Sequence, residues 1–203
     1  LTVILVGLAM GTTVAVGQAV GAGDRKKASL SIGNTVTLFL GVSVALTAVL
    51  LLCVRPIVGI ISTPEEAVEG TVRYLTICFI GIPFITAYNI ISSIFRGLGD
   101  SRSPTYFIAI ACVANIVLDY VFMGVFHIGP AGAALGTIIS QTISVITALV
   151  AMGKKKIGIR VAGGDLKPQG KVMGQLLRVG VPVACQDGLI QVAFIIITII
   201  ANR

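Results

Sequence analysis

The amino-acid sequence predicts an all-α, polytopic transmembrane helix bundle. Of its 203 residues, 56% are hydrophobic and only 11% are charged, whereas a soluble domain carries about 25% charged residues. The mean hydropathy is +1.02, and six charge-poor stretches are long enough to cross a lipid core. This composition excludes a water-soluble globule, a disordered chain, a collagen and a coiled coil.

The first three apolar stretches are expected at residues 1–16, 29–54 and 72–95. The first gives way to glycines and then to charges at residues 21–27, which predicts a helix end and a turn. In the connector that follows the second stretch, Ser/Thr-x-x-Glu spacing predicts a helix start near Pro64. Pro83 lies inside the third stretch, where a packed bundle can satisfy the carbonyl that proline frees. It therefore predicts a kink and not a break.

The remaining three stretches are expected at residues 105–126, 131–152 and 179–201. A tight polar hairpin precedes the first of them, and Pro104 suits the first turn of the following helix. The middle one is rich in small residues, which favour close helix packing. Before the last stretch, residues 171–178 could form a short interfacial helix within a long basic loop.

The positive charges predict how the chain is oriented. The formal net charge is +7, and twelve of the fifteen Lys and Arg residues fall in three alternate loops. Cytoplasmic loops are enriched in Lys and Arg, so residues 21–29, 96–104 and 153–178 are assigned to the cytoplasm. The surplus charge then sets orientation and indicates no nucleic-acid partner, which would need a basic face. The expected surroundings are a lipid bilayer, with the chain crossing the cell membrane several times.

Motif searches indicate neither an enzyme nor a resident cofactor. The chain has a single histidine and no P-loop, G-x-S-x-G or H-E-x-x-H motif. Its four cysteines lie singly in apolar segments, so we expect small buried hydrophobic residues and no disulfide or metal site. Both ends of the chain lie in or beside apolar runs without a signal peptide, and we expect a fragment of a longer protein.

Two acidic residues, Asp119 and Asp187, lie well inside predicted spans. A carboxylate there costs at least ~2.5–3.5 kcal/mol on insertion scales, so each needs a compensating role. Asp119 lies about 22 Å beyond Pro104 at 1.5 Å per residue, in the outer half of the membrane. Asn115 precedes it by one helical turn on the same face. Their oxygens favour a monovalent cation or a proton, and a structural hydrogen bond or a wet carboxylate is the alternative.

Asp187 lies about 13 Å beyond Arg178, near the middle of the membrane. Gln186 is its neighbour and Pro182 can open the helix beside it, so the acid either faces a cavity or forms a structural hydrogen bond. In the fifth stretch, Thr137 and Gln141 share one face. Polar residues of this kind join helices as often as they bind ligands.

Four motifs together resemble the multidrug and toxic compound extrusion (MATE) family. They are Gly17–Asp24 (GQAVGAGD), Phe95–Pro104 (FRGLGDSRSP), Asn115–Tyr120 (NIVLDY) and Gly129–Thr137 (GPAGAALGT). The resemblance covers essentially the whole chain and implies twelve spanning helices in two six-helix lobes. Residues 1–152 would hold the second half of the second helix through the sixth helix, which is most of the amino-terminal lobe. Residues 153–178 would be the inter-lobe loop and 179–203 the truncated start of the seventh helix.

The resemblance also implies a function and its site residues. The family consists of monomeric antiporters that export organic cations and other amphipathic drugs by alternating access, with Na⁺ or H⁺ as coupling ion and no cofactor. Asn115, Asp119 and Thr137, with the backbone of Ala133, would hold the proton or Na⁺, and Asp187 with Gln186 is the second-lobe candidate. A lipid-linked oligosaccharide flippase of the same superfamily is the nearest alternative, although the spans contain no internal Lys or Arg for pyrophosphate. A non-transporting scaffold would not need two buried acids.

Overall fold

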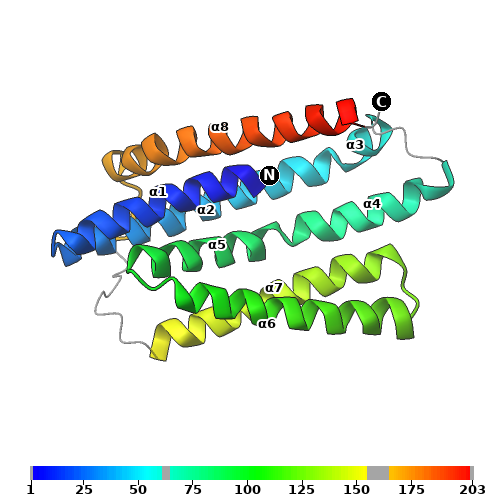
Figure 1. The fold of residues 1–203 in the computed structure, drawn as a ribbon, viewed down its shortest axis with the longest axis horizontal. Coiled ribbons are helices and arrows are strands. Elements are labelled where there is room, and N and C mark those ends of the chain that lie inside the picture. The colour runs from blue at the N-terminus through cyan, green and yellow to red at the C-terminus, as the bar shows by residue number, and fades with distance from the viewer. Residues whose placement is uncertain (1, 61–64, 155–164, 202–203) are drawn as a thin grey trace. The chain divides into compact units, whose positions relative to one another are not determined.

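The computed structural model describes residues 2–60, 65–154 and 165–201, and every element in these ranges is helical (Figure 1). The elements are α1 (Thr2–Gly21), α2 (Arg25–Leu52), α3 (Val54–Ile60), α4 (Glu65–Ile80), α5 (Ile82–Gly97), α6 (Arg102–Asp119), the π-helix η1 (Tyr120–Val125), α7 (Pro130–Lys154) and α8 (Gly170–Ala201). Among these described residues, five stretches are long and apolar enough to cross a membrane, at residues 25–52, 67–97, 102–125, 130–154 and 170–198. The predicted all-α membrane bundle is confirmed.

A glycine in the left-handed region makes the turn between α1 and α2. Gly23 has φ +72°, its N–H donates to the Val20 carbonyl, and the N–H of Asp24 donates to the Ala19 carbonyl, each at 3.0 Å. This pair of bonds is the Schellman pattern that closes a helix. Oδ1 of Asp24 then accepts from the N–H of Lys27 at 2.9 Å and caps α2. The turn predicted from the glycines and charges is confirmed.

The polar hairpin between α5 and α6 has the same construction. Gly99 has φ +83°, and it donates to the Arg96 carbonyl at 3.0 Å while Asp100 donates to the Phe95 carbonyl at 2.9 Å. Pro104 lies in the first turn of α6, as its fixed φ and missing N–H predict.

The third apolar stretch is interrupted at a single residue, Gly81, between α4 and α5. The N–H of Gly81 still bonds to the Ile77 and Cys78 carbonyls at 3.1 Å, but Pro83 two residues later has no N–H to offer. The apolar span at residues 67–97 is continuous, but the helix is interrupted at Gly81, whereas Pro83 predicted a kink and not a break. α4 begins at Glu65, as predicted, while Ser62, Thr63 and Pro64 lie outside the described residues.

At α8 the structure differs from the expected short helix followed by a separate span. Residues 170–201 form one helix with Pro182 inside it. Proline removes one backbone bond, yet a long apolar helix tolerates the loss. The residues from Lys171 to Arg178, expected to be a separate interfacial helix in the loop, are instead the first turns of α8. A second difference is α3, which occupies the beginning of the expected connector.

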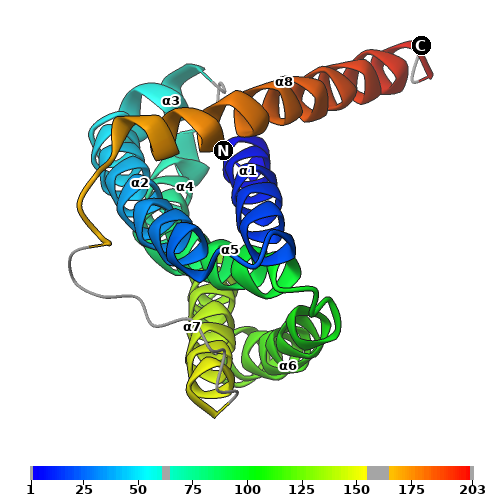
Figure 2. The ribbon, with the colours of Figure 1, turned by 90° about the vertical axis from the view of Figure 1, so that its left-hand side faces the viewer.

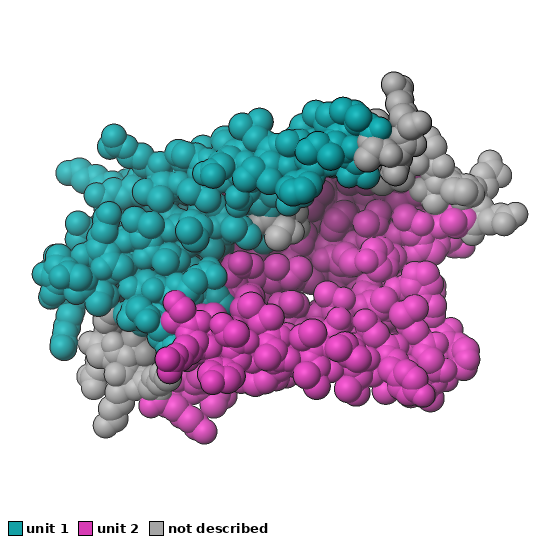
Figure 3. All heavy atoms as spheres, viewed as in Figure 1, with its two compact units in different colours: residues 1–39, 92–100, 158–203 teal, residues 40–91, 101–157 magenta. Residues whose placement is uncertain are grey.

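The chain divides into two compact units, shown in Figure 3. Unit 1 comprises Leu1–Phe39, Ser92–Asp100 and Gly158–Arg203, and within it α1 packs against α8, which it crosses in Figure 2. A Cβ added at Gly7 would lie 2.6 Å from the Gly180 carbonyl oxygen, and one added at Gly11 would overlap the Leu176 carbonyl oxygen. Glycines let two spanning helices approach to backbone contact, and this is the contact that joins α1 to α8.

Unit 2 comprises Leu40–Ile91 and Ser101–Ile157, and in it α7 packs against both α6 and α4. Ser144 of α7 is fully buried and its hydroxyl donates to the Phe107 carbonyl of α6 at 3.1 Å. The opposite face of α6 carries exposed apolar side chains such as Val113 and Ile116, each 64% exposed. Small polar groups inside and large apolar groups outside suit a helix surrounded by lipid or by other spanning helices.

Candidate cation site on α6 and α7

Asp119 is the last residue of α6 and is followed directly by the π-helical turn η1. π-Helical turns inside longer helices occur frequently at functional sites. The Asp119 side chain is half-buried, and its Oδ1 accepts a hydrogen bond from Nδ2 of Asn115 at 3.5 Å. This distance is longer than the roughly 2.7–3.2 Å that is usual for an N–H···O bond. The structure therefore brings the predicted pair together on one face and joins the two side chains loosely.

Two glycines of α7 make room for this part of α6 and η1. A Cβ added at Gly136 would overlap Oδ1 of Asp119, and one added at Gly132 would lie 3.0 Å from Cβ of Phe122. The carboxylate thus lies against the backbone of α7. Sequence reasoning noted the small residues of this helix but did not identify these two, although their G-x-x-x-G spacing is a known signal for close helix contact.

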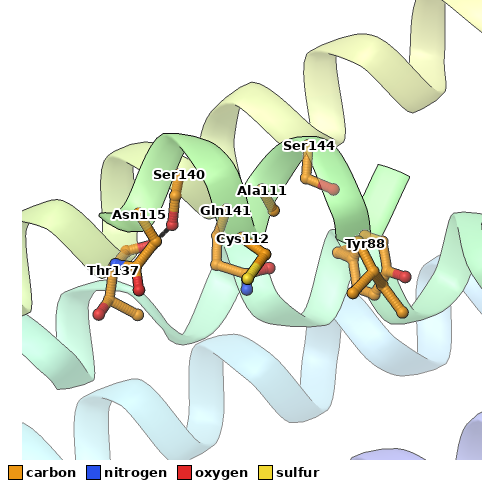
Figure 4. Close-up of a pocket in the computed structure, with 9 residues that line it drawn as sticks. Tyr88, Ala111, Cys112, Asn115, Thr137, Ser140, Gln141 and Ser144 are labelled. Carbon is orange, nitrogen blue, oxygen red and sulfur yellow. Dashed lines mark hydrogen bonds between the residues drawn. The ribbon is translucent and has the colours of Figure 1, made fainter. Parts of the chain in front are cut away.

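Thr137 and Ala133 lie one turn apart on α7, and the Thr137 hydroxyl donates to the Ala133 carbonyl at 3.0 Å. Thr137 also lines a pocket of about 180 Å³ together with Asn115. Asn115 therefore links the other predicted ligands, since it contacts Asp119 on its own helix and shares this pocket with Thr137 (Figure 4).

The pocket in unit 2 is lined mainly by neutral oxygen- and nitrogen-bearing side chains from α5, α6 and α7 (Figure 4). Its lining residues are Tyr88, Ile108, Ala111, Cys112, Asn115, Thr137, Ser140, Gln141 and Ser144. The Ser140 hydroxyl donates to the Thr137 carbonyl at 2.8 Å and the Tyr88 hydroxyl donates to the Pro104 carbonyl at 3.4 Å. These hydroxyls donate their hydrogen bonds to backbone carbonyls. Their oxygen lone pairs are therefore available to coordinate an ion or to accept a hydrogen bond from water. Hard oxygen donors of this kind suit Na⁺ or a hydrated proton.

The second acid, Asp187, lies on α8 in unit 1, five residues beyond Pro182. Its side chain is half-buried and that of Gln186 is exposed. Within the described ranges, no group of three or more His, Cys, Asp and Glu side chains lies close enough to hold a metal ion. The candidate site on α6 and α7 thus consists of the Asp119 carboxylate bonded to Asn115, with the pocket that Asn115 shares with Thr137 beside it.

The expectation that all four cysteines are buried is wrong. Cys53 and Cys78 are half-buried, while Cys112 and Cys185 are exposed. Cys112 also lines the pocket beside Asn115.

The part of the chain that the structure describes has five apolar spans, and two of them contain a half-buried acid. These features define the class of the molecule, which is a multi-pass helical membrane protein. A family model described as MatE matches residues 1–121. The chain belongs to this family, the MATE transporters.

Known relatives and structures agree with this assignment. The chain is 35% identical to the "Probable multidrug resistance protein YpnP" of Bacillus subtilis over 90% of its length and 40% of that protein. It is 30% identical to the "Probable multidrug resistance protein NorM" of Thermotoga maritima over 91% of its length and 40% of that protein. The chain thus spans less than half the length of these relatives.

Two solved structures show the same fold in different conformations. One is the inward-facing conformation of a multidrug resistance MATE family transporter, with a TM-score of 0.85 and 26% identity over 90% of this chain and 42% of that one. The other is the outward-facing conformation of such a transporter, with a TM-score of 0.86 and 26% identity over 96% of this chain and 43% of that one.

Proposed function

We propose that this chain is the amino-terminal part of a multidrug exporter that works as an antiporter. The full protein would move organic cations and other amphipathic compounds out across the cell membrane while Na⁺ or H⁺ flows in. The observation that carries the proposal is the Asp119 carboxylate, half-buried in an apolar span, bonded to Asn115 and lying against Gly136. The multidrug resistance names of the relatives support the cargo class.

Ion binding at Asp119 would act through charge and packing. Without a counterion the carboxylate is costly in an apolar span, and a proton or Na⁺ removes most of that cost. Asp119 directly precedes the π-helical turn whose Phe122 packs against Gly132. A shift of the carboxylate would therefore change the packing of this turn against α7. A cation that binds two conformations with different affinity shifts their populations, and cargo release is coupled to the ion in this way.

The proposal includes the surroundings and the partners of the site. The three basic loops would face the cytoplasm and the bilayer would surround a monomer, with Na⁺ or H⁺ in place of a resident cofactor. Asp187, with Gln186, is the candidate acid of the second lobe. Because the pocket beside Asn115 is lined by neutral groups, cationic or neutral cargo is favoured over the pyrophosphate of a lipid-linked oligosaccharide.

The test is efflux of a fluorescent organic cation by the full-length protein in an efflux-deficient host. Asp119→Asn is expected to abolish gradient-driven efflux, because it removes the charge that the ion neutralises and nearly keeps the shape. Asp24→Asn is the matched control, since asparagine also caps a helix. Collapsing the Na⁺ and proton gradients one at a time identifies the ion. Wild-type efflux by Asp119→Asn would contradict the proposed role of this carboxylate.

A further inference from the structure

Residues 165–169, immediately before α8, are hydrogen-bonded to one side of α2. The Ser29 hydroxyl donates to Oδ2 of Asp165 at 2.6 Å, and the Thr37 hydroxyl donates to the Leu166 carbonyl at 2.7 Å. The N–H of Gln169 donates to Oδ1 of Asn34 at 2.6 Å. All of these residues belong to unit 1, and the contacts span two turns of α2.

The face of α2 is shaped for this segment. Ser29, Gly33 and Thr37 follow one another at intervals of four residues and therefore share one side of the helix. A Cβ added at Gly33 would overlap the Asp165 carbonyl oxygen, so only glycine admits the segment at this distance. Two hydroxyl donors on either side of this glycine thus contact the Asp165 carboxylate and the Leu166 carbonyl.

Asn34 completes the contact from a fully buried position. Its Nδ2 donates to the Leu30 carbonyl at 2.9 Å and to the Asp165 carbonyl at 3.4 Å, and its Oδ1 accepts from Gln169. A buried amide that loses its partners is destabilising. The Asn34 amide therefore bonds both to its own helix, α2, and to the segment at residues 165–169.

The segment holds the beginning of α8. Gln169 precedes α8 directly, and its carbonyl accepts from the N–H of Met173 at 2.9 Å in the first turn. Six residues beyond its start, α8 makes the backbone contact with Gly11 of α1 at Leu176. α8 is therefore fixed to α1 by packing and to α2 through hydrogen bonds of the segment before it.

We propose that residues 165–169 form a latch, by which α2 holds the start of α8 in one state of the transport cycle and releases it in the other. This rests on the proposed alternating-access function, since α8 is where the chain would pass into the second lobe. The contacts suit release, because they are hydrogen bonds made by a segment whose residues 166–169 are exposed. Water can replace such partners when the segment leaves. Interactions made in only one state set the balance between two states.

The test is a reversible cross-link in the full-length protein. Ser29→Cys with Asp165→Cys, in a background without the native cysteines, places two thiols where a hydroxyl and a carboxylate are in contact. Oxidation is expected to form the disulfide and to stop efflux of the fluorescent cation, and a reductant is expected to restore it. Each single variant is the control and should transport with or without oxidant.

The outcomes distinguish the latch from the proposed function. Failure of the wild-type protein to export would contradict the proposed function. Failure of the two thiols to cross-link would contradict the contact, and undiminished efflux by the cross-linked protein would contradict release of the latch.

A second measurement does not depend on cross-linking. A Thr37→Cys reporter is expected to react several-fold faster with a membrane-impermeant maleimide when Gly33→Ala pushes the segment away. Gly41→Ala in the same helix is the control, because a Cβ there meets nothing within 4 Å. The labelling rate should also change when the ion gradient is collapsed, and equal rates under all these conditions would overturn the latch.

Discussion

Three carboxylates of this chain differ in how firmly the protein holds them. Asp24 accepts a backbone N–H at 2.9 Å at the start of α2, and Asp165 accepts a hydroxyl at 2.6 Å. The bond between Asp119 and Asn115 is 3.5 Å long. A group that must bind and release an ion needs weaker bonds from the protein than a group that fixes a turn. Asp119 has this property, although it lies in an apolar span.

At the residue scale, Gly136 is expected to position the Asp119 carboxylate. In Gly136→Ala the new methyl group would overlap Oδ1 of Asp119 and turn the carboxylate away from its present place. Loss of such an indirect support weakens ion binding by about tenfold or more. The ion concentration for half-maximal efflux by the full-length protein should therefore rise by about that factor, while maximal efflux is retained at high ion concentration.

Gly153→Ala is the matched control for this prediction, because a Cβ at that end of α7 meets nothing within 4 Å. An unchanged ion dependence in Gly136→Ala would contradict the positioning role. A fall in maximal efflux alone would indicate damage to folding.

Only those parts of the candidate site that lie on one helix could be predicted from the spacing of residues along the sequence. Asn115 and Asp119 differ by one turn, and their contact is the one that the spacing predicts. Gly136 and the pocket around Cys112 depend on how α7 packs against α6. The spacing of residues within one helix does not determine how that helix packs against another. Gly136 and the pocket could therefore be assigned to the site only from the structure.

At the element scale, the sequence predicted where helices end more accurately than whether a helix continues or changes its geometry. The turns at Gly23 and Gly99 use local hydrogen bonds that a glycine permits, so residues a few positions apart determine them. The π-helical turn η1 packs its Phe122 against Gly132 of another helix. The joining of residues 171–178 to the rest of α8 likewise coincides with packing on α1. Such features depend on partners far along the chain.

The crossing of α1 and α8 gives a prediction at this scale. Gly7→Ala would place a methyl group 2.6 Å from the Gly180 carbonyl oxygen and 2.7 Å from the Ala184 backbone nitrogen. Backbone atoms of a helix cannot relieve a steric overlap by changing rotamer, as a side chain can. The two helices must therefore separate. Overpacking of this kind costs about 1–3 kcal/mol, and we expect a lower Tm of the full-length protein in detergent.

Gly21→Ala is the control for the crossing, because the same change at the end of α1 meets nothing within 4 Å. Equal Tm values for the two variants would show that α1 and α8 do not meet at Gly7.

Across the whole molecule, the distribution of polarity is that of a protein in lipid. Fully buried positions include Thr12, Thr35, Ser93 and Ser144, while large apolar residues such as Leu52 and Leu189 are exposed. Thr12 and Thr35 contact each other between α1 and α2 at 3.2 Å. Composition predicted the membrane, and the structure adds that small polar side chains join the helices.

The distribution of charge predicts the sidedness of the whole chain. Lys26 lies in the basic first turn of α2 and His127 lies in a turn with few charges, at opposite ends of the expected topology, and each is replaced by cysteine. A membrane-impermeant thiol reagent should label the first only in inside-out vesicles and the second only in intact cells. Labelling of both from the same side would contradict the assigned topology.

The π-helical turn after Asp119 also acts as a register shift. The N–H of Phe126 bonds to the Val121 carbonyl, five residues back, so this turn holds one residue more than an α-helical turn. Deletion of a single residue from Tyr120–Val125 could restore regular α-helix without breaking the chain's path. Each residue of an α-helix corresponds to about 100° of rotation. The wide turn takes up its extra residue, whereas one residue added to an uninterrupted α-helix would rotate the carboxylate by about 100° relative to everything that follows it.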